Sequence, residues 1–218
     1  MKKVLALISA ILILFTVSCS DNYDFEDKIV VFKGDFVSKP YITALANENY
    51  YMDFSLVYNG RVISNTLATD GNVIESRSEV DGSFSHTIFI DGATYFLDDE
   101  NKVYFKADVS SEDGLRGIID YSKCKYIGSG KADILIGNGY NYDEFSCKTI
   151  YGENCTVRIF TDEKGEFAAI VDSMGEDSVE RDIAYFSSDI PDGWLSVPED
   201  YTLVDEETFF EMYYGDER

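Results

Sequence analysis

The chain has 218 residues, 45% of them hydrophobic, and it carries 41 acidic residues against 18 basic ones, a formal net charge of −23. So large a negative charge argues against nucleic acid as a partner and against close approach to anionic lipid headgroups. The apolar content is sufficient for one sizeable core, and no Pro- or Gly-rich linker divides the chain.

The N-terminus has the three regions of a secretory signal peptide. Lys2 and Lys3 precede an apolar run over residues 4–15, which is shorter than the ~20 residues that a spanning helix needs. The segment TVSC, ending at Cys19, resembles a bacterial lipoprotein processing site, which implies that Cys19 becomes the lipid-bearing first residue. Ordinary cleavage with an incidental Cys19 is the alternative. We predict a lipoprotein signal peptide over 1–18, a tether and N-terminal segment over 19–37, and a single β-rich domain over 38–218.

Evenly spaced turn signals organise the chain from residue 50 onward. Each Asn-Gly or Asp-Gly pair tolerates the positive φ angles of a two-residue hairpin turn, and strands at this spacing indicate an antiparallel meander. The fold class is therefore predicted as mainly β (α+β), with a curved antiparallel meander sheet and a few short helices. The signals are Asn59-Gly60, Asp70-Gly71, Asp81-Gly82, Asp91-Gly92, the DDEN of 98–101, Asn138-Gly139 and the DEKG of 162–165.

Side chains alternate along the predicted strands, which indicates a sheet with one apolar face. The segments RVISNTLATD and NVIESRSEV are more polar on both sides, which predicts strands that are short, exposed or at the rim. The residues grouped on the apolar face are Tyr50, Met52, Phe54, Leu56 and Tyr58, then Phe84, His86, Ile88 and Ile90, then Tyr95 with Leu97 and Val103 with Phe105.

Three short helices are expected. Ser38 and Pro40 in SKPYITALANEN are typical of a helix start. A second helix is possible in SSEDGLRGIIDYS, where Ser111 could cap a short turn. The third lies in DEETFFEMYY, where Asp205 precedes acidic first-turn residues and aromatic side chains gather on one side.

Three cysteines remain if Cys19 is lipidated, so an exported chain can form at most one internal disulfide. With Asn138-Gly139 as a turn, residue 124 opposes residue 153. This register favours a Cys124–Cys155 pairing over one that uses Cys147. A fully reduced, structural set is the alternative.

No residue pattern indicates a catalytic or metal site. His86 is the only histidine, it alternates with Phe84 and Ile88, and no nucleophile motif lies nearby, so we predict a structural role for it. One histidine and no C-x-x-C argue against a transition-metal site. We therefore predict that the protein is not an enzyme and has no cofactor. Trp194 in IPDGWLSVPEDY is expected to be buried at the end of the sheet rather than to form a contact surface.

The meander of residues 50–107, the second meander YDEFSCKTIYGENCTVRIFTDEKGEFAAI and the closing IPDGWLSVPEDY resemble bacterial extracytoplasmic lipoproteins with the LolA/LppX-like half-barrel fold. This resemblance implies a lipid-anchored protein outside the cytoplasm, with an apolar cavity for a lipid. Close packing of the same face, with no space left, is the alternative. The residues predicted to contact an apolar ligand are Met52, Phe54, Leu56, Phe84, Ile88, Ile90, Leu97 and Phe105.

Two functions follow as hypotheses. The first is a membrane-anchored carrier or holder of a lipid or another apolar ligand. The second is a non-catalytic interaction or adhesion module, whose acidic surface docks a cationic protein partner and whose binding is sensitive to salt. An open apolar cavity with bound lipid would distinguish the first hypothesis from the second.

Overall fold

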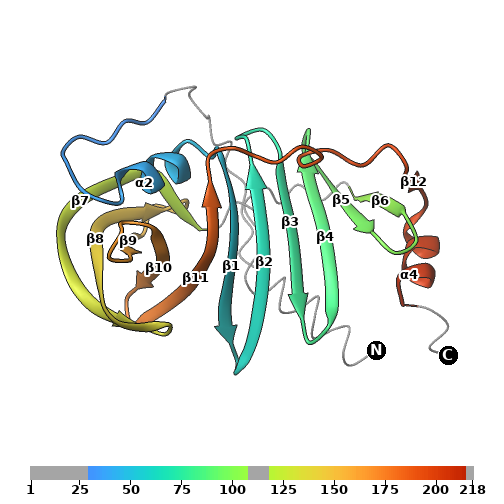
Figure 1. The fold of residues 1–218 in the computed structure, drawn as a ribbon. Coiled ribbons are helices and arrows are strands. Elements are labelled where there is room, and N and C mark those ends of the chain that lie inside the picture. Colours follow the sequence, from blue (N-terminus) through green and yellow to red (C-terminus); the bar gives the residue numbers. More distant parts are fainter. Residues whose placement is uncertain (1–28, 108–117, 215–218) are drawn as a thin grey trace.

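The computed structural model describes residues 29–107 and 118–214, and this part of the chain forms a twelve-stranded sheet with two helices. The strands lie in the order β12-β6-β5-β4-β3-β2-β1-β11-β10-β9-β8-β7. Figure 1 shows β7 to β11 curling strongly, whereas β1 to β4 run side by side in a flatter sheet. The predicted mainly β, curved antiparallel architecture is confirmed. The elements are α2 (Lys39–Ala46), β1 (Tyr50–Tyr58), β2 (Arg61–Thr69), β3 (Ile74–Val80), β4 (Ser83–Ile90), β5 (Ala93–Asp98), β6 (Val103–Ala107), β7 (Ile119–Ile134), β8 (Gly137–Thr149), β9 (Asn154–Thr161), β10 (Phe167–Met174), β11 (Asp177–Ser187), β12 (Thr202–Leu203) and α4 (Glu206–Tyr214).

Two meanders meet in the middle of this sheet. β1 to β6 form the first, β7 to β11 form the second, and they join where β1 pairs with β11 in antiparallel orientation. β12 adds to β6 in parallel, so the end of the chain lies along the outer strand of the first meander. Of the alternatives predicted for the two polar strands, the position at the rim was wrong, because β2 and β3 lie in the interior of the sheet.

The hairpin turns follow the predicted chemistry at most positions. Asn59, Asp81 and Asp91 have φ angles of 51°, 52° and 52°, and a glycine with positive φ follows each of them. Such a pair of left-handed residues gives the twist that a two-residue hairpin needs. Asn138-Gly139 was wrongly predicted as a turn. It lies inside β8, and the connection from β7 to β8 is made by residues 135 and 136.

This displaced turn decides the disulfide. Ile134 pairs with Gly137, three residues before the predicted closing pair at residues 137 and 140, and Lys125 pairs with Ser146 instead of residue 152. Residue 124 therefore lies beside residue 147 and not opposite residue 153. The structure accordingly joins Cys124 to Cys147 and leaves Cys155 free and buried, which corrects the predicted Cys124–Cys155 pair.

The largest core cluster fills the inside of the curled strands, with α2 packed against it. Pro40 lies in the first turn of α2, as predicted, but the Ser38 hydroxyl makes no capping bond; its backbone N–H donates to Asp143 Oδ2 at 2.8 Å. The N-terminal segment joins this core through Phe32. The fully or nearly fully buried members of this cluster include Ile42, Leu45, Met52, Phe145, Cys147, Val157, Ile159 and Ile170.

The two remaining helix predictions had different outcomes. The predicted helix over 110–122 lies mostly outside the described residues, and its end, residues 119–122, is the start of β7, so that end was wrongly predicted. The C-terminal helix is confirmed as α4. Asp205 caps it by accepting the Thr208 backbone N–H at 2.8 Å, and Phe209 is buried against Phe105 of β6.

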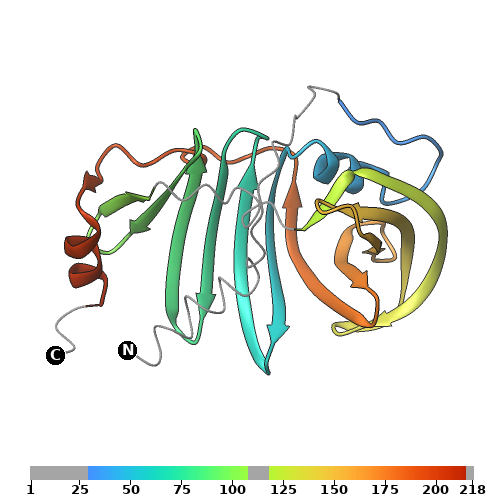
Figure 2. The same ribbon diagram turned by 180° about the vertical axis from the view of Figure 1, so that it is seen from behind.

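The closing segment, residues 188–201, connects β11 in the middle of the sheet to β12 beyond β6, and both views show it running along one end of the strands (Figures 1 and 2). It covers a second apolar cluster that includes Ile88 and Leu97, through Leu195, Val197 and Tyr201. The C-terminal part of the chain thus packs on both faces of the first meander, with the closing segment on one face and α4 on the other.

Candidate ligand cavity

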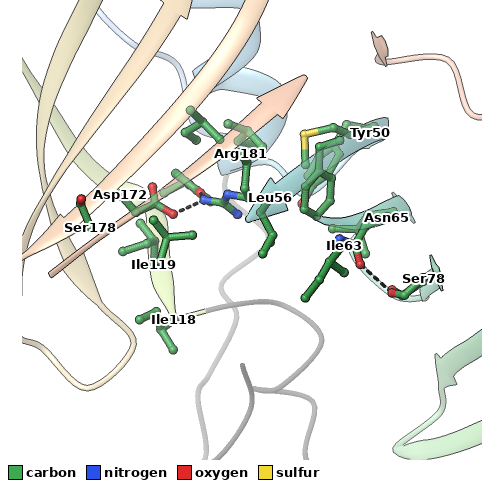
Figure 3. A pocket seen from close by; sticks show the side chains of 18 of the residues that line it. Tyr50, Leu56, Ile63, Asn65, Ser78, Ile118, Ile119, Asp172, Ser178 and Arg181 are labelled. Atoms are coloured by element: carbon green, nitrogen blue, oxygen red, sulfur yellow. Dashed lines mark hydrogen bonds and ion pairs between the residues drawn. The ribbon is translucent and has the colours of Figure 1, made fainter. Parts of the chain in front are cut away.

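A cavity of about 210 Å³ lies on the face of the sheet that carries Phe54, between β1 to β4 and the curled strands β10 and β11. Figure 3 shows lining residues on the two sides of Leu56, with Asp172 and Ile119 on one side and Ile63 and Asn65 on the other. Concave, mostly apolar linings with a few polar groups are typical of small-molecule sites. The apolar lining residues are Leu45, Tyr50, Met52, Phe54, Leu56, Ile63, Leu67, Val80, Ile118, Ile119, Ile170, Met174 and Val179.

Small side chains on β3 and β4 leave this space open. In one row across the sheet, Phe54 pairs with Asn65, Asn65 with Ser78, and Ser78 with Ser85. Large apolar side chains on β1 are therefore replaced by small polar ones two and three strands away. Asn65 and Ser78 are joined by a hydrogen bond of 2.6 Å, in which the Ser78 hydroxyl donates. The cavity thus has an apolar wall and a polar wall.

The lining residues differ in exposure. Leu45 of α2 and Ile119 of β7 are buried. Asp177, Ser178 and Val179, at the β10–β11 turn, are exposed. The lining therefore reaches from the buried core to the surface at this turn.

A buried ion pair forms part of the lining. Arg181 of β11 donates through Nη2 to Asp172 Oδ2 of β10, and the same nitrogen lies 3.1 Å from the Tyr121 hydroxyl (Figure 3 shows the ion pair). Burial raises the pKa of Asp172 although Arg181 lies against it, and burial also raises the pKa of Tyr121. A charged pair on the wall of an apolar cavity is a candidate for recognising the polar part of a ligand.

The structure separates the eight residues predicted to contact an apolar ligand. Met52, Phe54 and Leu56 line the cavity. Phe105 lies on the same face but packs under α4. The other four lie on the opposite face: Phe84 is 64% exposed, and Ile88, Ile90 and Leu97 belong to the cluster beneath the closing segment.

The register of the hairpins explains this separation. Tyr58 pairs with Arg61, Thr69 with Ile74, and Val80 with Ser83, so an even-numbered residue always opposes an odd-numbered one. Opposed residues share a face. The face that holds even-numbered residues on β1 therefore holds odd-numbered residues on β4, and the predicted grouping of Phe54 with Ile88 was wrong.

His86 lies in a polar cluster on this opposite face and is only 6% exposed. Its Nδ1 lies 2.7 Å from Asp99 Oδ1, and its Nε2 lies 2.9 Å from Glu75 Oε1. Tyr201 of the closing segment donates to the same Asp99 oxygen at 2.7 Å, and the Leu195 N–H donates to Glu75 Oε2 at 2.7 Å. Both ring nitrogens are thus engaged, and neither is left to act as a base. The cluster fastens the closing segment to the sheet.

Trp194 reinforces the same attachment. Its ring stacks on the Arg77 guanidinium, with 4.0 Å between Arg77 Cζ and the ring centroid, and it makes an edge contact with Tyr51. The side chain is half-buried on the outside of the sheet rather than fully buried at its end. Such a contact is worth about 0.5–1 kcal/mol at an exposed site and more where water is excluded.

The stability of the protein is expected to fall as the pH rises through the pKa of His86. Burial opposes the charged imidazole, but the hydrogen bonds to Asp99 and Glu75 outweigh it and raise this pKa. The contribution of His86 to the free energy of unfolding is therefore complete below about pH 6.5, the pKa of histidine in the unfolded state, and it is lost as the pH rises above the raised pKa of the folded state. At the acid side, the His86 hydrogen bond lowers the pKa of Asp99, so that contribution is lost as the pH falls through the lowered value.

Urea unfolding of the wild type and of His86→Gln between about pH 5.5 and pH 9 measures this effect. The stability difference between the two proteins should shrink towards high pH. A difference that stays constant over this range would show that folding does not shift the pKa of His86, and a difference that shrinks towards low pH would show that folding lowers it.

Residues 29–107 and 118–214 hold neither a metal cluster nor a membrane-spanning helix. No group of three or more His, Cys, Asp or Glu side chains in these ranges is placed to hold a metal ion. Within the same ranges, neither helix has the length and apolar character to cross a membrane. Cys19 and the signal peptide lie outside the described residues.

Comparisons with known proteins give structural neighbours only. No protein-family model matches the sequence, and no curated protein is significantly similar to it. The solved structures that align include an uncharacterized conserved protein from Thermus thermophilus, with 10% identity, a TM-score of 0.41, and coverage of 77% of this chain and 98% of that chain. LprF from Mycobacterium bovis aligns with 8% identity, a TM-score of 0.41, and coverage of 76% and 95%. MucB aligns with 11% identity, a TM-score of 0.37, and coverage of 75% and 63%. At these values the likeness supports no statement on ligand, activity or family.

Proposed function

We propose that this protein is a lipid-anchored, extracytoplasmic binding protein that holds an apolar or amphiphilic molecule in the cavity beside β1. The observation that carries the proposal is the cavity itself, whose lining includes Met52, Phe54 and Leu56 and reaches exposed residues at the β10–β11 turn. The predicted signal peptide and Cys19 support a position at the membrane.

The size of the cavity limits the ligand. Its volume of about 210 Å³ is below the ~300–1,000 Å³ of sites for drug-sized molecules. A single acyl chain, or the end of a longer one, fits this space better than a bulky ring system. Each methylene group that leaves water contributes about 0.8 kcal/mol to binding. A short acyl chain therefore gains enough binding free energy to stay in the cavity.

Native mass spectrometry with organic extraction tests this function. Residues 20–218, which include every described element, are expressed in a cell that makes lipids. We expect a bound lipid at stoichiometric amount, and we expect Phe54→Lys to reduce its occupancy by at least about tenfold, because an unpaired charge in an apolar cavity is costly.

Val57→Lys is the matched control, since Val57 lies on the same strand, faces away from the cavity and is 54% exposed. It should keep the lipid. A clean mass without lipid, with no uptake of added lipid, would contradict the proposal and favour the interaction module with a cationic partner. Ile88 is unsuitable as a test position because it lies under the closing segment.

A further inference from the structure

The ion pair between Asp172 and Arg181 lies in the cavity wall, where removing the two charges from water is unfavourable. The two side chains are 12% and 20% exposed, and taking two charges out of water costs several kcal/mol per ion before their attraction repays it. An apolar pair of similar volume would often be neutral or stabilising at such a place. Packing alone therefore gives no reason for these two residues.

The pair also leaves hydrogen-bonding capacity unused. The hydrogen bonds of Arg181 to Asp172 and to Tyr121 both use Nη2. Within the part of the chain that the structure describes, Arg181 Nε, Asp172 Oδ1 and Asn65 Nδ2 are buried without a partner. A guanidinium has five N–H donors. Two donor groups and one acceptor thus belong to residues on opposite walls of the cavity (Figure 3).

The charges around the cavity limit which ligand head group can bind to the N–H donors of Arg181 and Asn65. Among the ionised lining residues, Asp172 and Asp177 contribute −2 and Arg181 contributes +1, which gives −1. The whole chain carries −23. A carboxylate or phosphate would be repelled on entering this field, and a cation would be placed against Arg181. An uncharged head group meets neither penalty.

We propose that the ligand is an uncharged amphiphile whose head group carries a carbonyl and a hydroxyl oxygen, such as a hydroxylated ester or amide, and that Arg181 and Asp172 recognise this head. The carbonyl accepts from Arg181, the hydroxyl donates to Asp172, and the chain lies along Met52 and Phe54. This inference rests on the proposed function, because it concerns the same cavity.

Isothermal titration with three ten-carbon probes tests the head group. They are monodecanoylglycerol, decanoate and decyltrimethylammonium, which share chain length and differ in charge. For residues 20–218 we expect the glyceride to bind about tenfold or more tightly than either ion, the effect of one or two well-placed hydrogen bonds to a charged group. The preference for the glyceride over the two ionic probes should remain when the salt concentration is changed.

The double variant Asp172→Leu/Arg181→Met removes the pair while keeping the wall filled. It should still bind the glyceride, but about tenfold more weakly than the wild type, because the hydrogen bonds to the head group are lost. The exposed ion pair of Arg61 and Asp81, 3.2 Å apart, gives the matched control Arg61→Met/Asp81→Leu, which should keep the wild-type affinity for the glyceride. Trp194 fluorescence on urea titration checks that each variant is folded.

The outcomes separate the two proposals. Equal binding of all three probes, or a preference for an ion, overturns the head-group inference and leaves the apolar binding function intact. An affinity for the glyceride that is unchanged in the double variant also overturns it, since Arg181 and Asp172 then make no hydrogen bond to the head group. No binding of any probe by the folded wild type overturns the binding function itself.

Discussion

Replacing Glu75 with alanine is expected to lower the free energy of unfolding by about 3–5 kcal/mol, the usual effect of removing one partner from a buried ion pair. The Glu75 side chain is fully buried. It accepts from His86 Nε2 at 2.9 Å, from Arg77 Nη2 at 2.7 Å and from the Leu195 backbone N–H at 2.7 Å. Alanine leaves these donors without an acceptor, and it releases the closing segment from β3.

Urea unfolding followed by the fluorescence of Trp194, the single tryptophan of the chain, measures this loss. Trp194 lies in the closing segment and reports directly on its attachment. Glu79→Ala is the matched control, because Glu79 lies on the same strand and the same face but is exposed; it should change stability by less than about 0.5 kcal/mol. A loss below about 1 kcal/mol for Glu75→Ala would show that the closing segment is held mainly by apolar contacts.

Removing the disulfide is expected to lower the free energy of unfolding by about 3.5 kcal/mol. Cys124 and Cys147 are 23 residues apart, and the chain entropy that a loop of this length loses in the unfolded state corresponds to about that value. The bond fixes the start of β7, where Ile119 and Tyr121 line the cavity. Cys124→Ser/Cys147→Ser should therefore also weaken ligand binding.

Cys155→Ala is the control, because Cys155 faces Cys147 across β8 and β9 without being part of the bond. Burial raises the pKa of its thiol to about 11, so little of it is the reactive thiolate at neutral pH. Differential alkylation with peptide mapping should find only this thiol free among residues 29–107 and 118–214. A mapped Cys147–Cys155 bond would contradict the Cys124–Cys147 disulfide.

Much of the fold could be predicted from local patterns. Asn-Gly and Asp-Gly pairs fix hairpins because few other residues adopt positive φ at low cost, and three of the four such pairs in the first meander form the expected two-residue turns. The fourth, Asp70-Gly71, begins a longer connection over residues 70–73. The starts of α2 and α4 were likewise visible, from Pro40 and Asp205. The failure at Asn138-Gly139 has a physical reason too. A glycine with positive φ also fits a bulge inside a strand.

The cavity residues were only partly accessible to sequence reasoning. Met52, Phe54 and Leu56 follow from alternation along one strand. Asp172 could have been noticed, because it alternates with Ile170 and Met174 and therefore lies on an apolar face. Arg181 could not be matched to it, since β10 and β11 set this contact through their pairing: Asp172 lies opposite Val179, two residues before Arg181.

The sequence by itself determined the class of fold, the hairpin positions of the first meander and the two helix starts, because each depends on a few neighbouring residues. The tertiary structure alone decided which face each strand shows to the cavity, which cysteine pairs with Cys124, and which carboxylate meets Arg181. These depend on register, and a shift of one residue in a strand sends every side chain to the other face. The function proposed here rests on that second kind of information.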